Sequence, residues 1–252
     1  MKYKFSRIAC FIDKYGIFKG ISLYFVFKFK HATKIKVPGI SSAFFLRKNT
    51  SDAAVFDQVF LHGDYNINFS FVPTVIVDAG ANIGLFTIVM KNRFPEAKVI
   101  CVEPDKDNYE ILKKNVSGYK NVELMHAGLW SSETKLNVVD KYEMGHSALV
   151  VEENKEKGDV QAITIDMLMR TQHIDRIDVL KIDIETSERE LFLQNYEEWL
   201  PKVRLIIIEL HDWMKDGCSK PFFEAINKSF NKYSYAICGA NTIIENKDLN
   251  CQ

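Results

Sequence analysis

A run of small and polar residues, VIVDAGANIG, offers the clearest chemistry in this sequence of 252 residues. Asp78 ends the short β-branched run of residues 75–77, and Gly80, Asn82 and Gly84 follow at two-residue intervals. The amides of a helix N-terminus attract phosphate, carboxylate or ribose groups, and glycine lets the backbone approach such a ligand closely. The pattern therefore predicts a strand, a tight turn and a helix that bind a nucleotide-type cofactor.

The spacing of the glycines indicates which cofactor is bound. A dinucleotide site has the order G-x-G-x-x-G after its strand, which this turn does not match, so an NAD-linked oxidoreductase is a disfavoured alternative. An acid followed by two glycines four positions apart resembles motif I of class I S-adenosylmethionine-dependent methyltransferases. In that family the turn passes the amino-acid part of the cofactor. A turn that only packs is disfavoured, because it would leave Asp78 unpaired at the end of a buried strand.

A second acid supports this interpretation. Glu103 follows the apolar strand predicted at residues 98–102, about twenty residues past the turn, where an acid typically binds the hydroxyls of a ribose. Its two carboxylate oxygens can accept both hydroxyl protons. After the third predicted strand, at residues 122–125, the small residue Ala127 can lie against an adenine ring.

Two later strands also end in polar residues. Asp183 and Glu185 follow the strand at residues 179–182, and Glu209 and His211 follow a further strand. Open α/β sheets bind ligands at the carboxyl ends of their strands. We therefore predict Asp183, Glu185 and His211 as catalytic residues, any of which could act as the base that an alcohol acceptor needs.

His211 has two alternatives to a catalytic role. An unperturbed histidine has a pKa near 6.5, which suits a base, but a hydrogen-bonded structural role at the strand end is about as probable. Asp183, Glu185, Glu209 and His211 could instead hold a divalent cation that orients a diol. Their spacing matches no specific metal motif, so no residue is assigned as a metal ligand.

The elements that must position these residues alternate between strands and helices, which is typical of an open α/β sheet. A helix between residues 52 and 62 is predicted to close the cofactor pocket, with Tyr65 near its mouth. Two short strands at residues 136–139 and 148–151 are predicted to form a hairpin beside the pocket. A second hairpin, over residues 233–244, closes the domain.

The N-terminal part has a different composition. Residues 1–40 contain nine lysines and arginines but a single acid, Asp13, and bulky apolar side chains are interleaved with them. We predict a basic amphipathic extension at residues 1–40, followed by one catalytic domain at residues 41–252. Contact with a membrane surface through residues 1–36 is one role for the extension. The favoured role is that of a helix packed on the domain.

Composition limits the partners and the location. The chain carries 33 basic and 33 acidic residues, so its formal net charge is zero, and the basic extension leaves the catalytic part net acidic. Nucleic acid is therefore not expected as a partner. Five cysteines without metal-ligand spacing indicate a reducing compartment. No apolar run reaches the roughly 18 residues of a spanning helix, and no cleavage site follows the N-terminal apolar part. We expect a cytoplasmic protein, peripheral at most to the inner face of the membrane.

Four stretches in this order resemble the FkbM family of S-adenosylmethionine-dependent methyltransferases: DAGANIG, VEPD, AGLW with ITIDMLM, and LKIDIETSE followed by IIIELH. The resemblance extends from about residue 43 to about residue 230. It implies a Rossmann-like α/β fold, with a mainly parallel seven-stranded sheet, helices on both faces and a closing antiparallel hairpin. The upstream stretch LRKNTSDAAVFDQVF is similar to the lead-in of family members encoded with surface polysaccharide genes.

The resemblance also implies roles for individual residues. The glycine turn would line the amino-acid end of S-adenosylmethionine, Glu103 would hold its ribose, and Asp183 and Glu185 would face the methyl group and the acceptor. Family members usually have glycine and alanine where this chain has Thr186 and Ser187. A β-branched residue is strained at a positive φ, so we expect a different acceptor loop.

The expected function is O-methylation of a sugar hydroxyl in a surface polysaccharide or glycolipid precursor. The alternatives are methylation of a non-sugar small molecule and a non-catalytic adapter that keeps the fold. Retention of Asp78, Asn82 and Glu103 disfavours the adapter. The oligomeric state is not predicted.

Overall fold

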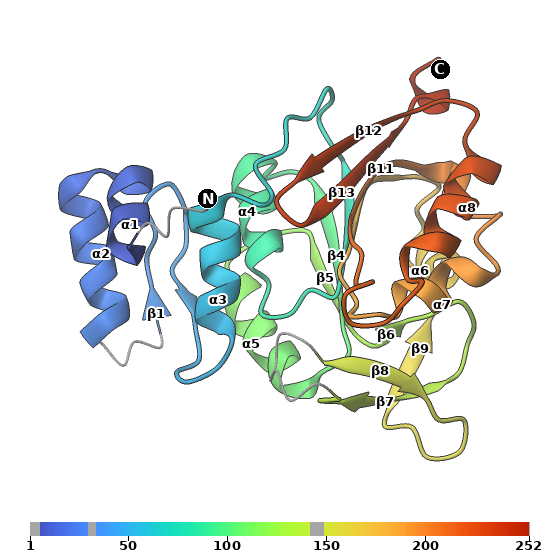
Figure 1. Ribbon diagram of the computed structural model, residues 1–252, viewed down its shortest axis with the longest axis horizontal. Helices are drawn as coiled ribbons and strands as arrows, with labels where there is room; N and C mark the ends of the chain where they lie inside the picture. Colours follow the sequence, from blue (N-terminus) through green and yellow to red (C-terminus); the bar gives the residue numbers. More distant parts are fainter. Residues whose placement is uncertain (1–5, 30–33, 142–148, 252) are drawn as a thin grey trace.

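The computed structural model describes residues 6–29, 34–141 and 149–251, and its centre is a seven-stranded sheet (Figure 1). The strand order is β12-β13-β11-β10-β3-β4-β5. Five strands run parallel, whereas β13 is antiparallel to both of its neighbours. The strands are β3 (Val75–Ala79), β4 (Lys98–Glu103), β5 (Val122–His126), β10 (Ile177–Ile182), β11 (Val203–Glu209), β12 (Tyr233–Cys238) and β13 (Asn241–Asn246).

Helices cover both faces of this sheet, because the central strands are apolar on both sides. Successive residues of β3 illustrate this: Ile76 packs into one hydrophobic cluster and Val77 into the other. The first cluster contains side chains of α4 (Leu85–Arg93) and α5 (Lys106–Val116). The second contains those of α6 (Ile165–Thr171), α7 (Glu188–Leu193) and α8 (Ser219–Ser229). The predicted Rossmann-like fold, including its closing antiparallel hairpin, is confirmed.

A smaller sheet lies beside the main one, in the order β6-β9-β7-β8. The hairpin predicted after Leu129 is part of it, because β7 and β8 pair antiparallel. Within the connection between them, residues 142–148 lie outside the described residues. The four strands are β6 (Gly128–Leu129), β7 (Lys135–Val139), β8 (Val150–Glu153) and β9 (Val160–Ile163).

The N-terminal helices α1 (Arg7–Tyr15) and α2 (Ile17–Phe29) form a hairpin at one end of the molecule, as Figure 1 shows. A Cβ on Gly20 would lie 2.4 Å from the carbonyl oxygen of Phe11, so the two helices can approach this closely only with glycine there. Strand β1 (Lys34–Ile35) follows and pairs with β2 (Phe44–Phe45).

The helical hairpin packs on the domain through its inner face. Phe11 is completely buried and its ring stacks on that of Phe56, with centroids 6.1 Å apart. Phe56 ends α3 (Asp52–Phe56), which a π-helical turn (Asp57–His62) extends, and Arg7 pairs with Asp57 at 2.9 Å. The predicted extension therefore shares one hydrophobic core with the rest of the chain.

The tip of the hairpin points away from this core. Ile17 and Phe18 are 62% and 89% exposed, and the neighbouring side chains of Lys14 and Lys19 are also exposed. Among the described helices, none has the length and apolar character needed to cross a bilayer.

Candidate active site

A cavity lies at the carboxyl ends of β3, β4, β10 and β11, where the sequence placed a ligand. The helical segment over residues 52–62 closes one side of it through Val55 and Val59, as predicted, and Tyr65 also lines it. One half of its wall comes from the glycine turn and Glu103. The other half is rich in acids, and its polar residues are Asp64, Lys181, Asp183, Glu185, Glu209, His211 and Asn241.

The glycine turn presents its backbone to the cavity. Gly80 has a φ of 74°, and a Cβ there would lie 1.7 Å from the carbonyl oxygen of Asp183, so no other residue fits. Asn82 also has a positive φ, 49°, and its side-chain oxygen accepts a hydrogen bond from the Ile83 amide at 2.8 Å. Gly84 lies outside the cavity lining: a Cβ there would lie 2.6 Å from Leu112, so this glycine lets α4 pack against α5.

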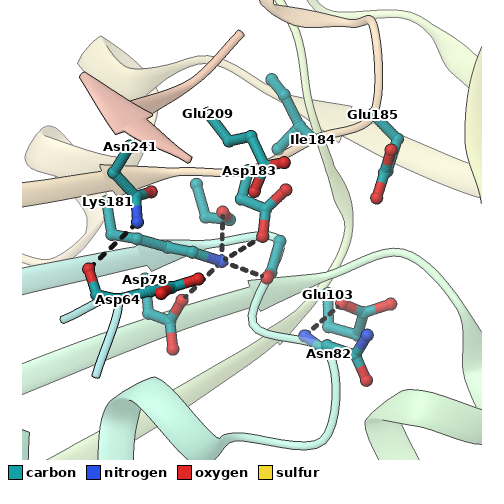
Figure 2. A network of polar contacts seen from close by, with 12 residues as sticks. Asp64, Asp78, Asn82, Glu103, Lys181, Asp183, Ile184, Glu185, Glu209 and Asn241 are labelled. Atoms are coloured by element: carbon teal, nitrogen blue, oxygen red, sulfur yellow. Dashed lines mark hydrogen bonds and ion pairs between the residues drawn. The ribbon is translucent and has the colours of Figure 1, made fainter. Parts of the chain in front are cut away.

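Glu103 is held in one orientation at the cavity wall. Its carboxylate accepts a hydrogen bond from the amide of Asn82 at 2.7 Å (Figure 2), and further ones from the amide of Asp105 at 3.0 Å and the side chain of Asn108 at 3.3 Å. Burial raises the pKa of Glu103 to about 7, although these hydrogen bonds oppose the shift. Each carboxylate oxygen has more than one acceptor site, so the group can still accept hydroxyl protons from a ribose.

Asp78 does not line the cavity; it is completely buried beneath the glycine turn. The Thr87 hydroxyl donates to its carboxylate at 2.7 Å, and the ammonium of Lys181 lies 3.4 Å from the other oxygen. The argument that a purely packing turn would leave Asp78 unpaired is therefore wrong. Ala127 also lies outside the lining, whereas its neighbours Gly128 and Leu129 contribute to it.

Lys181 is the main site residue that sequence reasoning missed. Its buried Nζ donates to the Gly80 carbonyl at 2.6 Å and lies 3.5 Å from the carboxylate of Asp183 (Figure 2). Burial lowers the pKa of Lys181, but Asp183 and Asp78 more than compensate and raise it above its usual value. The available signal was a lysine inside an otherwise apolar strand, since a buried charge requires partners.

His211 is the centre of the acid-rich half. It is 2% exposed, its Nδ1 lies 3.0 Å from the buried carboxylate of Glu188, and its Nε2 lies 3.2 Å from Glu185. The same Nε2 is 3.8 Å from both Asp183 and Glu209. The structure thus brings the three predicted catalytic residues together.

The protonation state of His211 differs from the expected one. Burial lowers its pKa, but the hydrogen bond that its Nδ1–H donates to Glu188 and the surrounding carboxylates outweigh burial and raise the pKa to about 10. The expectation that His211 titrates near 6.5 is therefore wrong, because it assumed an unperturbed ring. A protonated imidazole cannot accept a proton, so the residues available as a base in this state are the carboxylates.

The loop after β10 keeps positive backbone angles despite its unusual residues. Glu185 and Thr186 have φ values of 49° and 73°, and Thr186 is buried. Thr186 therefore adopts the positive φ that strains a β-branched residue, at a cost of about 1–2 kcal/mol per left-handed residue. That the acceptor loop differs from that of other family members stays a prediction. Glu188 compensates in part, since its carboxylate also accepts the Ile184 amide at 3.1 Å.

Two further lining residues were not predicted. Trp213 lies at the rim with 66% of its surface exposed, and Asn241 is buried opposite Glu209 in the pairing of β11 with β13. Trp213 follows His211 by two positions, which could have drawn attention to it. Asn241 comes from the closing hairpin, and no local pattern connects it with the acids.

Comparison with known proteins agrees with this geometry. The sequence of residues 78–237 matches the family described as the methyltransferase FkbM domain. Methyltransferase sdnD of Sordaria araneosa is 30% identical over 206 residues, which cover 68% of this chain and 78% of sdnD. Methyltransferase 1 of Beauveria bassiana is 25% identical over 178 residues, 62% of this chain and 72% of that protein.

Among solved structures, methyltransferase FkbM from Methylobacillus flagellatus KT is 14% identical, with a TM-score of 0.48. The match covers 72% of this chain and 45% of that chain. Membership of the family is established by sequence similarity. It implies that S-adenosylmethionine is the co-substrate. The chain belongs to the FkbM family of methyltransferases.

Proposed function

We propose that this protein transfers a methyl group from S-adenosylmethionine to a hydroxyl of a sugar, in a surface polysaccharide or glycolipid precursor. The observation that carries the proposal is one cavity that joins a ribose-binding acid, Glu103, to a group of carboxylates beneath an exposed tryptophan. The first half fits the cofactor and the second half fits a polyol.

The lining of the cofactor half suits the chemical groups of S-adenosylmethionine. Glu103 is oriented by three donors and accepts the ribose hydroxyls, while the backbone of Gly80 to Asn82 faces the amino-acid end. Pro104 and Leu129 offer apolar surface to the adenine. When bound, the sulfonium supplies an electrophilic methyl group, so the chain has only to align the reactants and exclude water.

The acceptor half supplies hydrogen-bond acceptors and a proton acceptor. Asp183 and Glu185 line the cavity, and we assign them to the hydroxyls of the acceptor, one of which gives its proton to a carboxylate as the methyl group is transferred. His211 orients Glu185 through the 3.2 Å contact and is itself held by Glu188. In this assignment His211 positions the base and does not act as one.

Trp213 supports a sugar as the acceptor. Its exposed ring at the cavity rim offers a flat apolar face, and a sugar ring combines an apolar C–H face with hydroxyl edges. Carboxylates at the cavity floor would then receive the hydroxyls, and a site with buried polar groups discriminates against molecules that lack them. The net acidic catalytic part disfavours nucleic acid.

The tip of the N-terminal hairpin supports a membrane-associated acceptor. Ile17 and Phe18 are exposed beside Lys14 and Lys19, which is the combination that inserts into an anionic lipid surface. We assign this tip to peripheral contact with the inner face of the membrane, where a lipid-linked glycan is accessible.

Replacing Glu103 with alanine should raise the dissociation constant for S-adenosylhomocysteine about 10- to 100-fold, since charge-assisted hydrogen bonds contribute about 1.5–3 kcal/mol. Because the pKa of Glu103 is raised to about 7, the wild-type constant should be about tenfold higher at pH 6 than at pH 8. Calorimetry at both pH values measures this, with exposed Glu123→Ala as the control. A Glu103→Ala variant that binds like the wild type would contradict the ribose assignment.

Deleting the gene should remove a methyl group, about 14 Da, from a surface glycan analysed by mass spectrometry. The wild-type gene should restore the group, whereas Asp183→Asn should not, and Trp213→Ala should restore it poorly through a raised KM for the acceptor. If the glycans of wild-type and deletion cells are identical and a methylated small molecule is lost instead, the sugar acceptor would be contradicted. The methyltransferase activity would still stand. No change in any methylated product would favour an adapter.

Vesicle co-sedimentation tests the membrane contact. Wild-type protein should sediment with vesicles containing anionic lipid, and less so as salt rises, because each lysine near the surface contributes about 1 kcal/mol that salt screens. Phe18→Ser should reduce sedimentation about tenfold or more, since burying a phenylalanine is worth about 1.5–3 kcal/mol. Val72→Ser, which changes another exposed apolar residue elsewhere, is the control. If Phe18→Ser and Val72→Ser sediment with vesicles to the same extent, the tip of the hairpin does not contact the membrane.

A further inference from the structure

We infer that Asp183, Glu209 and His211 form a binding site for a divalent cation at the acceptor end of the cavity. One ligand atom from each residue lies within 4.8 Å of the other two. Asp183 follows β10, and the other two come from the end of β11, the neighbouring parallel strand. Once Nε2 gives up its proton and its 3.2 Å contact with Glu185, small side-chain rotations would bring the three atoms around a common ion. Bonds from such an ion to these ligands are about 2.1 Å long.

The arrangement around His211 is that of a metal-binding histidine. Its Nδ1 lies 3.0 Å from the completely buried carboxylate of Glu188, which leaves Nε2 directed at the acids. Histidines that bind metals almost always donate their other ring N–H to a carboxylate, carbonyl or water, and this partner sets the ring orientation. Glu188 is therefore a positioning residue for the site.

The carboxylates also have the required free oxygens. One oxygen of Asp183 is 3.5 Å from Lys181, whereas the other faces His211 at 3.8 Å. Glu209 approaches the same Nε2 at 3.8 Å. Lys181 thus contacts Oδ2 of Asp183, and Oδ1, which faces His211, is left for a cation.

Asn241 provides an independent observation. Its side chain is 2% exposed, and its Nδ2 donates to the Asp64 carbonyl at 3.2 Å, which fixes the orientation of the amide. The opposite atom, Oδ1, is buried without a hydrogen-bond partner. Asn241 pairs directly with Glu209 across β11 and β13, so its oxygen lies on the side of the acids (Figure 2).

An unpartnered amide oxygen at this position costs free energy, and a cation or its bound water would satisfy it. Two carboxylates, an imidazole and an amide oxygen form a mixed donor set, which suits Mn²⁺, Fe²⁺ or Zn²⁺ better than Ca²⁺. The cation would bind the acceptor hydroxyl, or two neighbouring hydroxyls of a sugar, and favour transfer of the hydroxyl proton to the carboxylate of Glu185. This role rests on the proposed function, whereas the site itself does not.

The test is a titration of the full-length protein with Mn²⁺, followed by electron paramagnetic resonance of the free ion. We expect a single site in the wild type. Glu188→Gln should weaken it about 10- to 100-fold, as loss of an outer-shell carboxylate does. Asp183→Asn should weaken it at least as much. Glu190→Gln is the control, because Glu190 lies on the same helix but pairs with Arg189 outside the cavity.

Melting curves and S-adenosylhomocysteine binding in the same samples separate the possible failures. Wild-type protein that binds S-adenosylhomocysteine but not Mn²⁺ would overturn the cation site and leave the methyltransferase intact. Unchanged Mn²⁺ affinity in Asp183→Asn would also overturn it. If Asp183→Asn does not fold, Glu209→Gln decides the question by the same criterion. Mn²⁺ binding without S-adenosylhomocysteine binding would support the site and contradict the proposed cofactor.

Discussion

The buried charge of Lys181 is the constraint on which the rest of the site depends. A buried lysine near the carboxyl end of a central strand loses its hydration, and several kcal/mol must be recovered from partners of good geometry. Its partners are Asp78, Asp183 and the Gly80 carbonyl, so one ammonium connects the base of the glycine turn to Asp183, which we propose as an acceptor-side acid. Removing it would leave the buried carboxylate of Asp78 without a cationic partner and the Gly80 carbonyl without its hydrogen bond from β10.

The carboxyl ends of β3 and β10 pack tightly beside the contacts of Lys181. Gly80 approaches the Asp183 carbonyl so closely that no side chain fits, and the loop that follows Asp183 continues through two left-handed residues. Such strain persists only where the surroundings over-determine the backbone. Glu188 does this here by accepting hydrogen bonds from the Ile184 amide and from His211. The strained loop and the histidine are therefore held by one carboxylate.

The fold and the position of the site followed from local patterns. Strand and helix periodicities predicted an open α/β sheet, and the strand-end acids Glu103, Asp183 and Glu185 all line the predicted cavity. Asp78 and Gly84 belong to the same motif, but one holds Lys181 and the other allows helix packing. Sequence spacing could not separate these roles, because both depend on which neighbour lies behind the turn.

Other features depend on contacts between distant segments. The pKa of His211 is raised through Glu188, which lies on α7, and Asn241 reaches the acids from the closing hairpin. The N-terminal hairpin shows a related limit. Its amphipathic pattern was compatible with packing and with membrane contact, and the structure uses Phe11 for the core while leaving Phe18 exposed.

We propose that the contacts of Lys181 hold the cofactor half and the acceptor half of the cavity opposite each other. A crystal structure of the protein with S-adenosylhomocysteine tests this most directly. We expect the ribose hydroxyls to donate hydrogen bonds to the carboxylate of Glu103, and the sulfur to point toward Asp183 and Glu185. A ribose bound away from Glu103, or a sulfur that faces away from these acids, would contradict it.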